Sequence, residues 1–486
     1  MIDRAFASAT TLAAAIRDRD IGSRELLDHY LARIERLNPR INAVVTLDVE
    51  RARQRADAAD AALRRGTVLG SLHGVPMTVK DCLETTGLRT TAGAEVYTDY
   101  IPTHDALAVE RLVAAGAVIF GKTNTPTLAM DSQTYNPLFG TTNNPWNTGR
   151  SPGGSSGGAA AAVAAGLTAL EVGSDIGGSI RSPAHCCGVY GLKPSYGLIP
   201  TRGHIPPNPG VVTDVDINVL GPLARSASDL ELALDVLAGP DADRAVAWRL
   251  HLPPPRRRAL RDYRVAAWLD EPAYPVDAAV RARLEAAVAA LRKAGVTVDD
   301  GARPAFSLAD AFRDYLRLLF PATAWSFAPE AFEAMASYAQ QPSSSDDDPL
   351  RMIAADSTQR HREWLDANER REHYRRQWAT FFDDYDVLLC PINPVVAIPH
   401  DQSFNLMERT ITINGAARPY NDQMVWAGLV GMAYLPATVA PVGRTREGLP
   451  VGVQIVGPYL EDRTPIDFAR RLADVIGGFE APPGFE

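Results

Sequence analysis

Apolar residues recur at helical spacing at both ends of the chain. Within residues 1–66 the spacing is clearest in LLDHYLARIERL and ADAADAALRRG, where Gly66 supplies a stop. Residues 277–295 and the late RTPIDFARRLADVIGG show the same spacing, and each ends at glycine. We therefore expect helices at the beginning and at the end of the chain.

Between these ends, short apolar runs of strand type alternate with helical segments. GVPMTVK and AVIF flank the helical ALAVERLVAAG, and TALEVG follows the alanine-rich helix AAAAVAAG. Further strand-like runs are VTVDD, DVLLCP and LPVGVQIVG. Alternation of this kind predicts an α/β fold.

One stretch differs from the rest in composition. QQPSSSDDDP at residues 340–349 is polar and rich in helix breakers, and it separates the aromatic LRLLFPATAWSF from a strongly charged helix that contains Trp364 and Trp378. We interpret it as a mobile surface loop rather than a domain linker.

Composition limits the functional classes. The 486 residues are 46% hydrophobic and 22% charged, which suits a globular protein with a large core. The net charge of −9 and the scattered basic residues argue against nucleic-acid binding. No stretch approaches the length of a membrane span, and charged residues closely follow the short N-terminal apolar run. We expect a cytoplasmic protein that binds neither nucleic acid nor membrane.

The cysteines give no sign of a metal or a disulfide framework. No two of the four have CxxC or CxxxC spacing, which predicts reduced thiols and neither a metal site nor a cofactor that depends on them. They are Cys82, Cys186, Cys187 and Cys390.

Two motifs point to other enzyme classes, and the sequence context argues against both. GAVIFGKT at residues 116–123 matches the nucleotide-binding P-loop pattern, but its middle positions form a strand and follow a helical segment. GGSSG at residues 153–157 matches the nucleophile elbow of α/β-hydrolases, with Ser155 as nucleophile, yet turn residues rather than a strand precede it. That alternative also needs a histidine base, and the histidines considered are better interpreted as loop or core residues: His73, His104, His185 and His204.

Two clusters of glycine and serine have the composition that acyl transfer requires. They are SPGGSSGG at residues 151–158 and GSDIGGSIRSP at residues 173–183. Glycine leaves a hydroxyl nucleophile accessible and lets several backbone N–H groups converge on a developing oxyanion. In the second cluster the candidate donors are the amides of Ile176, Gly177, Gly178 and Ser179.

A serine nucleophile needs a base, and Lys80 in GVPMTVKD is the candidate because no histidine is marked for the role. Its ordinary pKa of about 10.4 must fall through burial or a nearby positive charge. The neighbouring Asp81 would raise that pKa if its carboxylate faced the amine. From the residues alone, an anion-binding nest or tight helix packing stays open as an alternative.

The same segments resemble the amidase signature family in motif order and spacing. The resemblance rests on GSDIGGSIRSPAHCCGVYGLKPSYG, SPGGSSGGAAAAVAAG and HGVPMTVKD, and is extended by GKTNTPTLAMDSQTYNPLFGTTNNPW and LPVGVQIVGP. It implies one large domain over residues 1–486, with three layers α/β/α and a central mixed β-sheet flanked by helices. Within that domain, residues 1–66 form the N-terminal helical segment, 75–200 the signature core and 305–420 a variable region at the substrate pocket.

The resemblance also assigns roles to individual residues. It makes Ser179 the nucleophile, Ser155 a bridging serine and Lys80 the terminal base, with the four amides named above as oxyanion donors. Gly154–Ser155 corresponds to a cis peptide bond in the family. Supporting roles around the nucleophile loop are implied for Ser156, Asp175 and Arg181.

This sequence departs from the family pattern at Ser174, where threonine is usual, and at Cys186–Cys187, where Phe-Cys is more common. We expect neither departure to contact the catalytic relay, and therefore expect shifts in packing rather than loss of activity.

The implied activity is hydrolysis of a C–N bond without metal or cofactor. NPLFG and NPW resemble segments of fatty acid amide hydrolases, and the overall character is similar to aryl acylamidases and bacterial urethanases, so we expect a small hydrophobic amide, anilide or carbamate as substrate. Ala129, Met130 and Asp131 are expected at the substrate, while LRLLFPATAWSF is either a pocket wall or core.

Two points stay open at this stage. The alternative function is the glutaminase subunit of a tRNA-dependent amidotransferase, although GLIPTRGHIPPNPGVVTDVDINVLGPLARS is unlike the segment expected there. The oligomeric state is also open, with a homodimer as one alternative.

Overall fold

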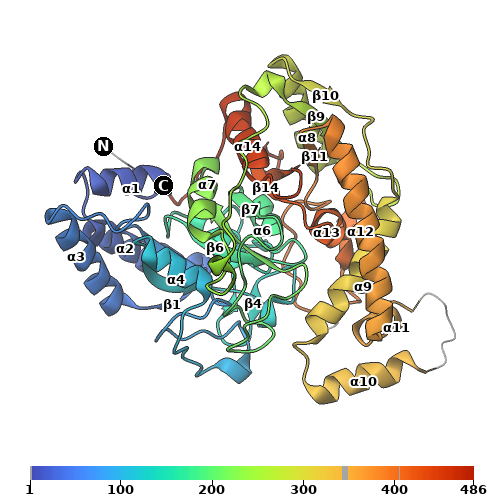
Figure 1. Ribbon diagram of the computed structural model, residues 1–486, viewed down its shortest axis with the longest axis horizontal. Helices are drawn as coiled ribbons and strands as arrows, with labels where there is room; N and C mark the ends of the chain where they lie inside the picture. The colour runs from blue at the N-terminus through green and yellow to red at the C-terminus, as the bar shows by residue number, and fades with distance from the viewer. Residues whose placement is uncertain (1–2, 342–347, 404–405) are drawn as a thin grey trace.

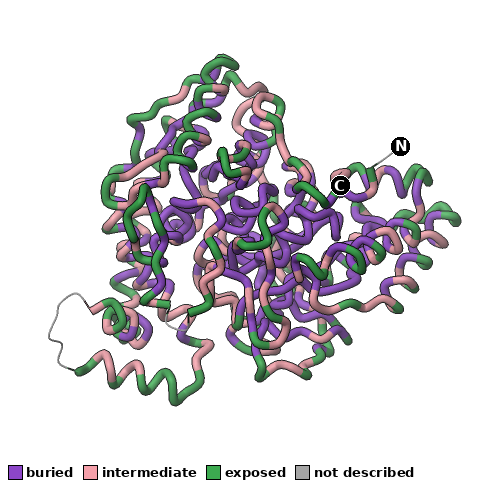
Figure 2. The backbone as a smooth tube through the Cα atoms, turned by 180° about the vertical axis from the view of Figure 1, so that it is seen from behind, coloured by how far each residue is buried: buried purple, intermediate pink, exposed green. Residues whose placement is uncertain are grey.

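The computed structural model describes residues 3–341, 348–403 and 406–486. Helices α1–α3 lie at one side of the molecule and α9–α12 at the other, with the main sheet between them (Figure 1). The central part of the tube in Figure 2 is buried, whereas no residue of α10 (Pro329–Ala339) is buried. Residues 342–347 of the proposed surface loop lie outside the described residues.

The N-terminal segment is helical, as predicted, but one strand interrupts it. Its helices are α1 (Ala9–Arg17), α2 (Ser23–Ile41) and α3 (Val49–Arg64). Between the last two lies β1 (Val44–Leu47), whose sequence VVTL favours a strand because three of its four residues are β-branched. The prediction of helix was therefore wrong at residues 44–47 only.

A small sheet carries the candidate base. β2 (Pro76–Lys80) runs parallel to β3 (Val118–Thr123), with α4 (Leu107–Ala114) as the crossover, and β1 pairs antiparallel with β3. Gly121, Lys122 and Thr123 all lie within β3, which confirms that GAVIFGKT is not a phosphate-binding loop. Lys80 is the last residue of β2.

The central sheet is mixed, as the resemblance implies. Its strand order is β10-β9-β11-β15-β14-β7-β8-β6; β9 pairs in parallel with β10 and β11, and the other pairs are antiparallel. Four strands match predicted runs: β6 (Glu171–Asp175), β10 (Thr297–Asp299), β11 (Val387–Cys390) and β15 (Pro450–Val456). The other four are β7 (Tyr190–Lys193), β8 (Val219–Ala224), β9 (Arg264–Ala267) and β14 (Ala437–Arg444).

Helices cover both faces of the middle of this sheet. Every residue of β6, β7, β8, β11 and β15 is buried, and successive residues of a strand point to opposite faces. α5 (Gly157–Ala164) and α6 (Arg181–Cys187) are buried throughout. In a second group of helices, α14 (Arg463–Ile476) packs against both α7 (Ala227–Leu237) and α8 (Ala278–Lys293).

The variable region adds a helical layer beside the sheet. α9 (Leu308–Ala324) packs against α11 (Pro349–Ser357), α12 (His361–Asp384) and α13 (Val425–Met432). Two small hairpins complete the fold: β4 (Tyr135–Asn136) with β5 (Gly140–Thr141), and β12 (Thr410–Ile413) with β13 (Ala416–Pro419). Among the described residues, none of the helices combines the length and apolar character that crossing a membrane needs.

Candidate active site

Three separate elements bring the predicted catalytic residues together. Lys80 ends β2, Ser155 lies just before α5, and Ser179 lies in the turn between β6 and α6. The Nζ atom of Lys80 is 2.6 Å from Oγ of Ser155, and both side chains are buried. Ser155 and Ser179 line the same narrow cavity, and Ser179 is the more exposed of the two. The structure therefore brings the amine of Lys80 into contact with Ser155, and places Ser155 and the more accessible Ser179 at one cavity.

The loop around Ser155 is held against its neighbours through backbone contacts. The Gly154–Ser155 peptide bond is cis, as the resemblance implies. The amide of Ser156 donates to the carbonyl of Ser179 (3.0 Å), and its Oγ donates to the carbonyl of Ser174 (3.3 Å). No strand precedes GGSSG, so the nucleophile-elbow geometry is absent from this described segment.

Burial lowers the pKa of the Lys80 amine, because a charged ammonium is costly without water. Cys82, Asp175 and Glu171 act in the opposite direction and do not outweigh burial. Asp81 was expected to raise the pKa of Lys80 if its carboxylate faced the amine. Instead, that carboxylate accepts hydrogen bonds from the hydroxyl and amide of Thr91. Burial thus makes the neutral form of Lys80 easier to reach than in an exposed lysine.

Ser174 is a further contact of the base, and the expectation about it was wrong. Its Oγ lies 3.0 Å from Nζ of Lys80. The threonine-to-serine departure therefore lies on the relay itself. Successive side chains of β6 point in opposite directions, and the hydroxyl of Ser174 faces β2. The spacing of residues in the sequence does not reveal which way this hydroxyl points.

One of the four predicted oxyanion donors already has an acceptor in the structure. The amide of Gly178 donates to Oδ1 of Asp175 (2.9 Å), so it is already engaged. The amides of Ile176, Gly177 and Ser179 have no acceptor among the described residues, which leaves three candidate donors rather than four. Gly178 has φ +106°, and an added Cβ would lie 2.9 Å from Cβ of Ala427, so this turn requires glycine.

Asp175 and Arg181 form a fully buried ion pair beneath the nucleophile loop. Nη2 of Arg181 is 2.7 Å from Oδ1 of Asp175. Burial alone would raise the pKa of Asp175, but the adjacent guanidinium outweighs burial and lowers that pKa to about 2. The carboxylate also accepts from the amide of Ile180, so the pair fixes the turn that carries Ser179.

The cavity at the two serines is narrow and its lining is uncharged. Ala129 and Met130 line it, as predicted, whereas Asp131 does not. Asp131 instead pairs with Arg409 (2.7 Å) and accepts from the hydroxyl of Tyr420 (2.6 Å), so its predicted substrate contact was wrong. The full lining is Leu128, Ala129, Met130, Ser155, Ser174, Ile176, Ser179, His204, Pro206, Pro207, Val215, Asn218, Ala322, Thr323 and Ser326.

Residues 204–218 form a wall that the sequence did not assign to the site. His204, interpreted from sequence as a loop or core residue, lines the cavity instead. The variable region contributes Ala322, Thr323 and Ser326, while Leu318 and Leu319 of the same LRLLFPATAWSF stripe are buried in the core. The stripe is therefore both wall and core.

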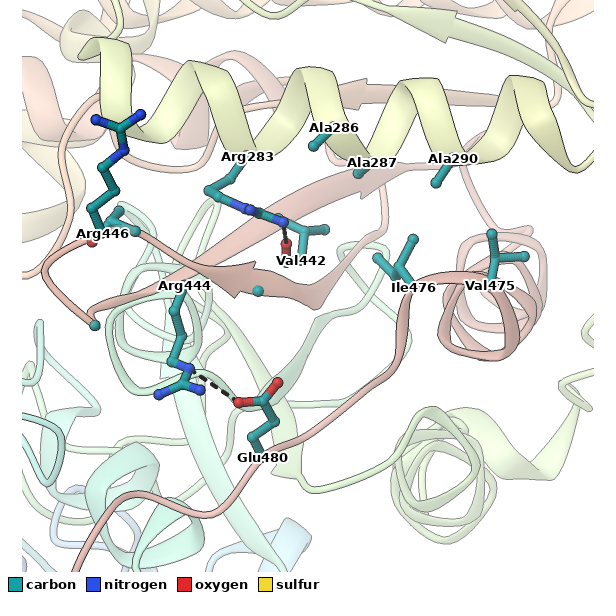
Figure 3. Close-up of a pocket in the computed structure, with 13 residues that line it drawn as sticks. Arg283, Ala286, Ala287, Ala290, Val442, Arg444, Arg446, Val475, Ile476 and Glu480 are labelled. Atoms are coloured by element: carbon teal, nitrogen blue, oxygen red, sulfur yellow. Dashed lines mark hydrogen bonds and ion pairs between the residues drawn. The ribbon is translucent and has the colours of Figure 1, made fainter.

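A wider outer cavity continues from this wall. It has a volume of about 450 Å³, shares Val215 and Ala322 with the inner cavity, and is lined further out by Trp325 and Trp364. A larger cavity beside α8, shown in Figure 3, shares no lining residue with the catalytic one; there Arg444 points toward Glu480.

A family model described as Amidase matches residues 25–465 of the chain. The chain belongs to the amidase signature family. The glutamyl-tRNA(Gln) amidotransferase of Anaeromyxobacter sp. (strain K) has an A subunit that is 35% identical, covering 97% of this chain and 96% of the relative. The corresponding protein of Synechococcus sp. (strain CC9902) is 32% identical over 98% of both chains.

Solved structures of the same fold include a hydrolase and an acylamidase. The structure of 6-aminohexanoate cyclic dimer hydrolase with its substrate superposes with TM-score 0.80, at 28% identity and full coverage of both chains. A bacterial aryl acylamidase gives TM-score 0.81 at 24% identity, covering 97% of this chain and 96% of its own, which shows the fold. This amidase signature protein is thus a C–N hydrolase of the serine type.

Proposed function

We propose that this amidase signature enzyme hydrolyses uncharged, apolar carboxamides, anilides or carbamates through an acyl-enzyme on Ser179. The observation that carries the proposal is the lining of the catalytic cavity, which includes no Asp, Glu, Lys or Arg. Its one ionisable side chain outside the relay is His204, and burial together with Lys80 lowers the pKa of His204 to about 3. A pocket of this kind favours substrates without formal charge.

In the proposed reaction, the hydroxyl of Ser179 attacks the carbonyl carbon while its proton passes to Ser155, whose own proton passes to neutral Lys80. The developing oxyanion lies at the free amides of Ile176, Gly177 and Ser179. The same relay then runs in reverse, so that Ser155 protonates the leaving nitrogen as the C–N bond breaks. A water molecule then attacks the acyl-enzyme and gives its proton to the same relay, and the acid leaves Ser179.

A second candidate is the glutaminase half of an amidotransferase, and the amidotransferase relatives favour it. Glutamine carries an α-ammonium and an α-carboxylate, which need charged partners when buried. The cavity lining offers none, and the acidic residues in the outer cavity are already paired: Asp216 with Arg371 at 2.7 Å, and Asp214 with the amide and hydroxyl of Thr201. This supports the stand-alone hydrolase over the glutaminase.

The test is a matched panel of an anilide, an aliphatic amide, an aryl carbamate and glutamine, assayed with the purified chain and with Ser179→Ala. We expect turnover of at least one apolar substrate, loss of that turnover in Ser179→Ala, and no ammonia from glutamine. Release of ammonia from glutamine alone, above all on addition of amidotransferase partner proteins, would establish the second candidate instead.

A further inference from the structure

His204 has one ring nitrogen bonded and the other free. Its Nδ1 is 3.0 Å from the carbonyl oxygen of Pro206, which can only accept, so Nδ1 carries the proton. Nε2 is then a bare acceptor, and it is buried without a partner among the described residues. The side chain as a whole is 6% exposed. Buried acceptors are rarely left unpaired, so an orphan at a cavity wall marks a place for a ligand donor.

The position of this acceptor relates it to the catalytic relay. His204 lines the same narrow cavity as Ser155 and Ser179. Burial is the largest cause that lowers the pKa of its imidazole, so His204 stays neutral and Nε2 stays an acceptor.

We propose that Nε2 of His204 accepts a hydrogen bond from the N–H of the scissile amide or carbamate, and thereby selects substrates whose leaving nitrogen carries a hydrogen. The inference rests on the proposed hydrolysis. It makes His204 a specificity-determining residue that contacts the leaving group.

This hydrogen bond would also affect how the leaving nitrogen is protonated. An amide nitrogen becomes basic only when its lone pair leaves conjugation in the tetrahedral intermediate, and that lone pair must then face Ser155 to be protonated. Holding the N–H toward His204 directs the lone pair away from it, toward the relay. Esters and N,N-disubstituted amides have no such hydrogen and gain nothing from the acceptor.

The experiment compares three substrates of the same acid: an anilide, its N-methylanilide and its phenyl ester. Wild-type enzyme is assayed beside His204→Leu, which removes the acceptor, and His204→Gln, whose side-chain oxygen can replace Nε2. The exposed His104 provides the control variant His104→Gln. The rate of fluorophosphonate labelling of Ser179 checks that each variant keeps its nucleophile and relay.

We expect His204→Leu to lower kcat/KM for the anilide by about 10- to 100-fold, the range for one lost hydrogen bond to a buried neutral group, while the ester changes by less than about 3-fold. His204→Gln should restore part of the anilide rate, and His104→Gln should match wild type. The preference of wild type for anilide over N-methylanilide should shrink in both His204 variants.

If His204→Leu leaves the ratio of kcat/KM for anilide to kcat/KM for ester unchanged, the proposed role of His204 is wrong, while the proposed hydrolysis stays in place. If His204→Leu does not fold, His204→Met, which also lacks the acceptor, is measured in its place. Failure of wild type to hydrolyse any of the three would instead overturn the proposed function, and with it this inference.

Discussion

Lys80 and Ser174 lie in direct contact inside the protein, with 3.0 Å between Nζ and Oγ. The same Nζ is 2.6 Å from Oγ of Ser155. A neutral amine has one lone pair and two hydrogens. When one hydrogen is directed to Ser174, the lone pair is free to face the hydroxyl of Ser155. Ser174 therefore orients the base, and its effect on activity is measurable.

Replacing Ser174 by alanine should lower kcat by about 5- to 30-fold, the cost of one hydrogen bond that orients a catalytic group. Ser174→Thr keeps the hydroxyl and should stay within about 3-fold of wild type. Steady-state kinetics on one apolar amide compares the two variants. If both variants lose the same activity, packing on β6 rather than the hydroxyl is responsible, and the orienting role is wrong.

The dependence of activity on pH should follow the neutral form of Lys80. Burial lowers its pKa below the ordinary value of 10.5, and the base works only when deprotonated. Activity should therefore be low in acid, rise as pH passes upward through the lowered pKa, and reach a plateau well before pH 10.5. A profile of kcat/KM against pH measures this, and a limb that rises only near the ordinary value would contradict a buried neutral base.

A fluorophosphonate should label Ser179, and Ser179→Ala should abolish both labelling and turnover. Ser179 is the more accessible serine and adjoins the free backbone amides, whereas Ser155 is 1% exposed and faces Lys80. Peptide mass spectrometry locates the label. Ser155→Ala should keep the nucleophile but lose the proton path, so its labelling should be slow rather than shifted to another site. Labelling of Ser155 in an active Ser179→Ala variant would restore the α/β-hydrolase interpretation.

The sequence predicted those parts of the site that depend on local pattern. Lys80 ends an apolar run, and the glycines around Ser155 and Ser179 mark accessible turns, so the residues themselves made these side chains candidates. The resemblance to the amidase signature family then assigned the role of each. Four strands of the central sheet were predicted from their apolar runs: β6, β10, β11 and β15. β1 was missed because four residues between two helices give little periodic signal.

The remaining parts depend on contacts between segments that are distant in the chain. Asp131 looked like a pocket residue because it follows Ala129 and Met130, yet Arg409, far along the chain, takes its carboxylate. His204 looked like a loop residue because nothing near it in sequence places it at the cavity of Ser155 and Ser179. The amide of Gly178 looked free because its acceptor, Asp175, was assigned only a supporting role.

The buried pair of Asp175 and Arg181 should make stability depend on pH in a specific direction. Arg181→Met removes the guanidinium and leaves the carboxylate buried without its counterion, which costs about 3–5 kcal/mol at neutral pH. In wild type the pKa of Asp175 is lowered to about 2, so its stabilising contribution is complete above the ordinary value of 3.8 and is lost only as pH falls toward 2. In the variant, burial is opposed only by Lys193 and the backbone amide donors, so the pKa of that carboxyl is higher than in wild type.

Protonation of Asp175 then relieves the penalty at a higher pH in Arg181→Met than in wild type. The difference in unfolding free energy between the two proteins should therefore be largest near neutral pH and shrink as the solution becomes acidic, which urea unfolding at several pH values measures. The exposed pair of Arg281 and Glu285 supplies the control, since Arg281→Met should change stability little at any of these pH values. A difference for Arg181→Met that stays constant across this range would mean that lost packing, not the unpaired carboxylate, destabilises the variant.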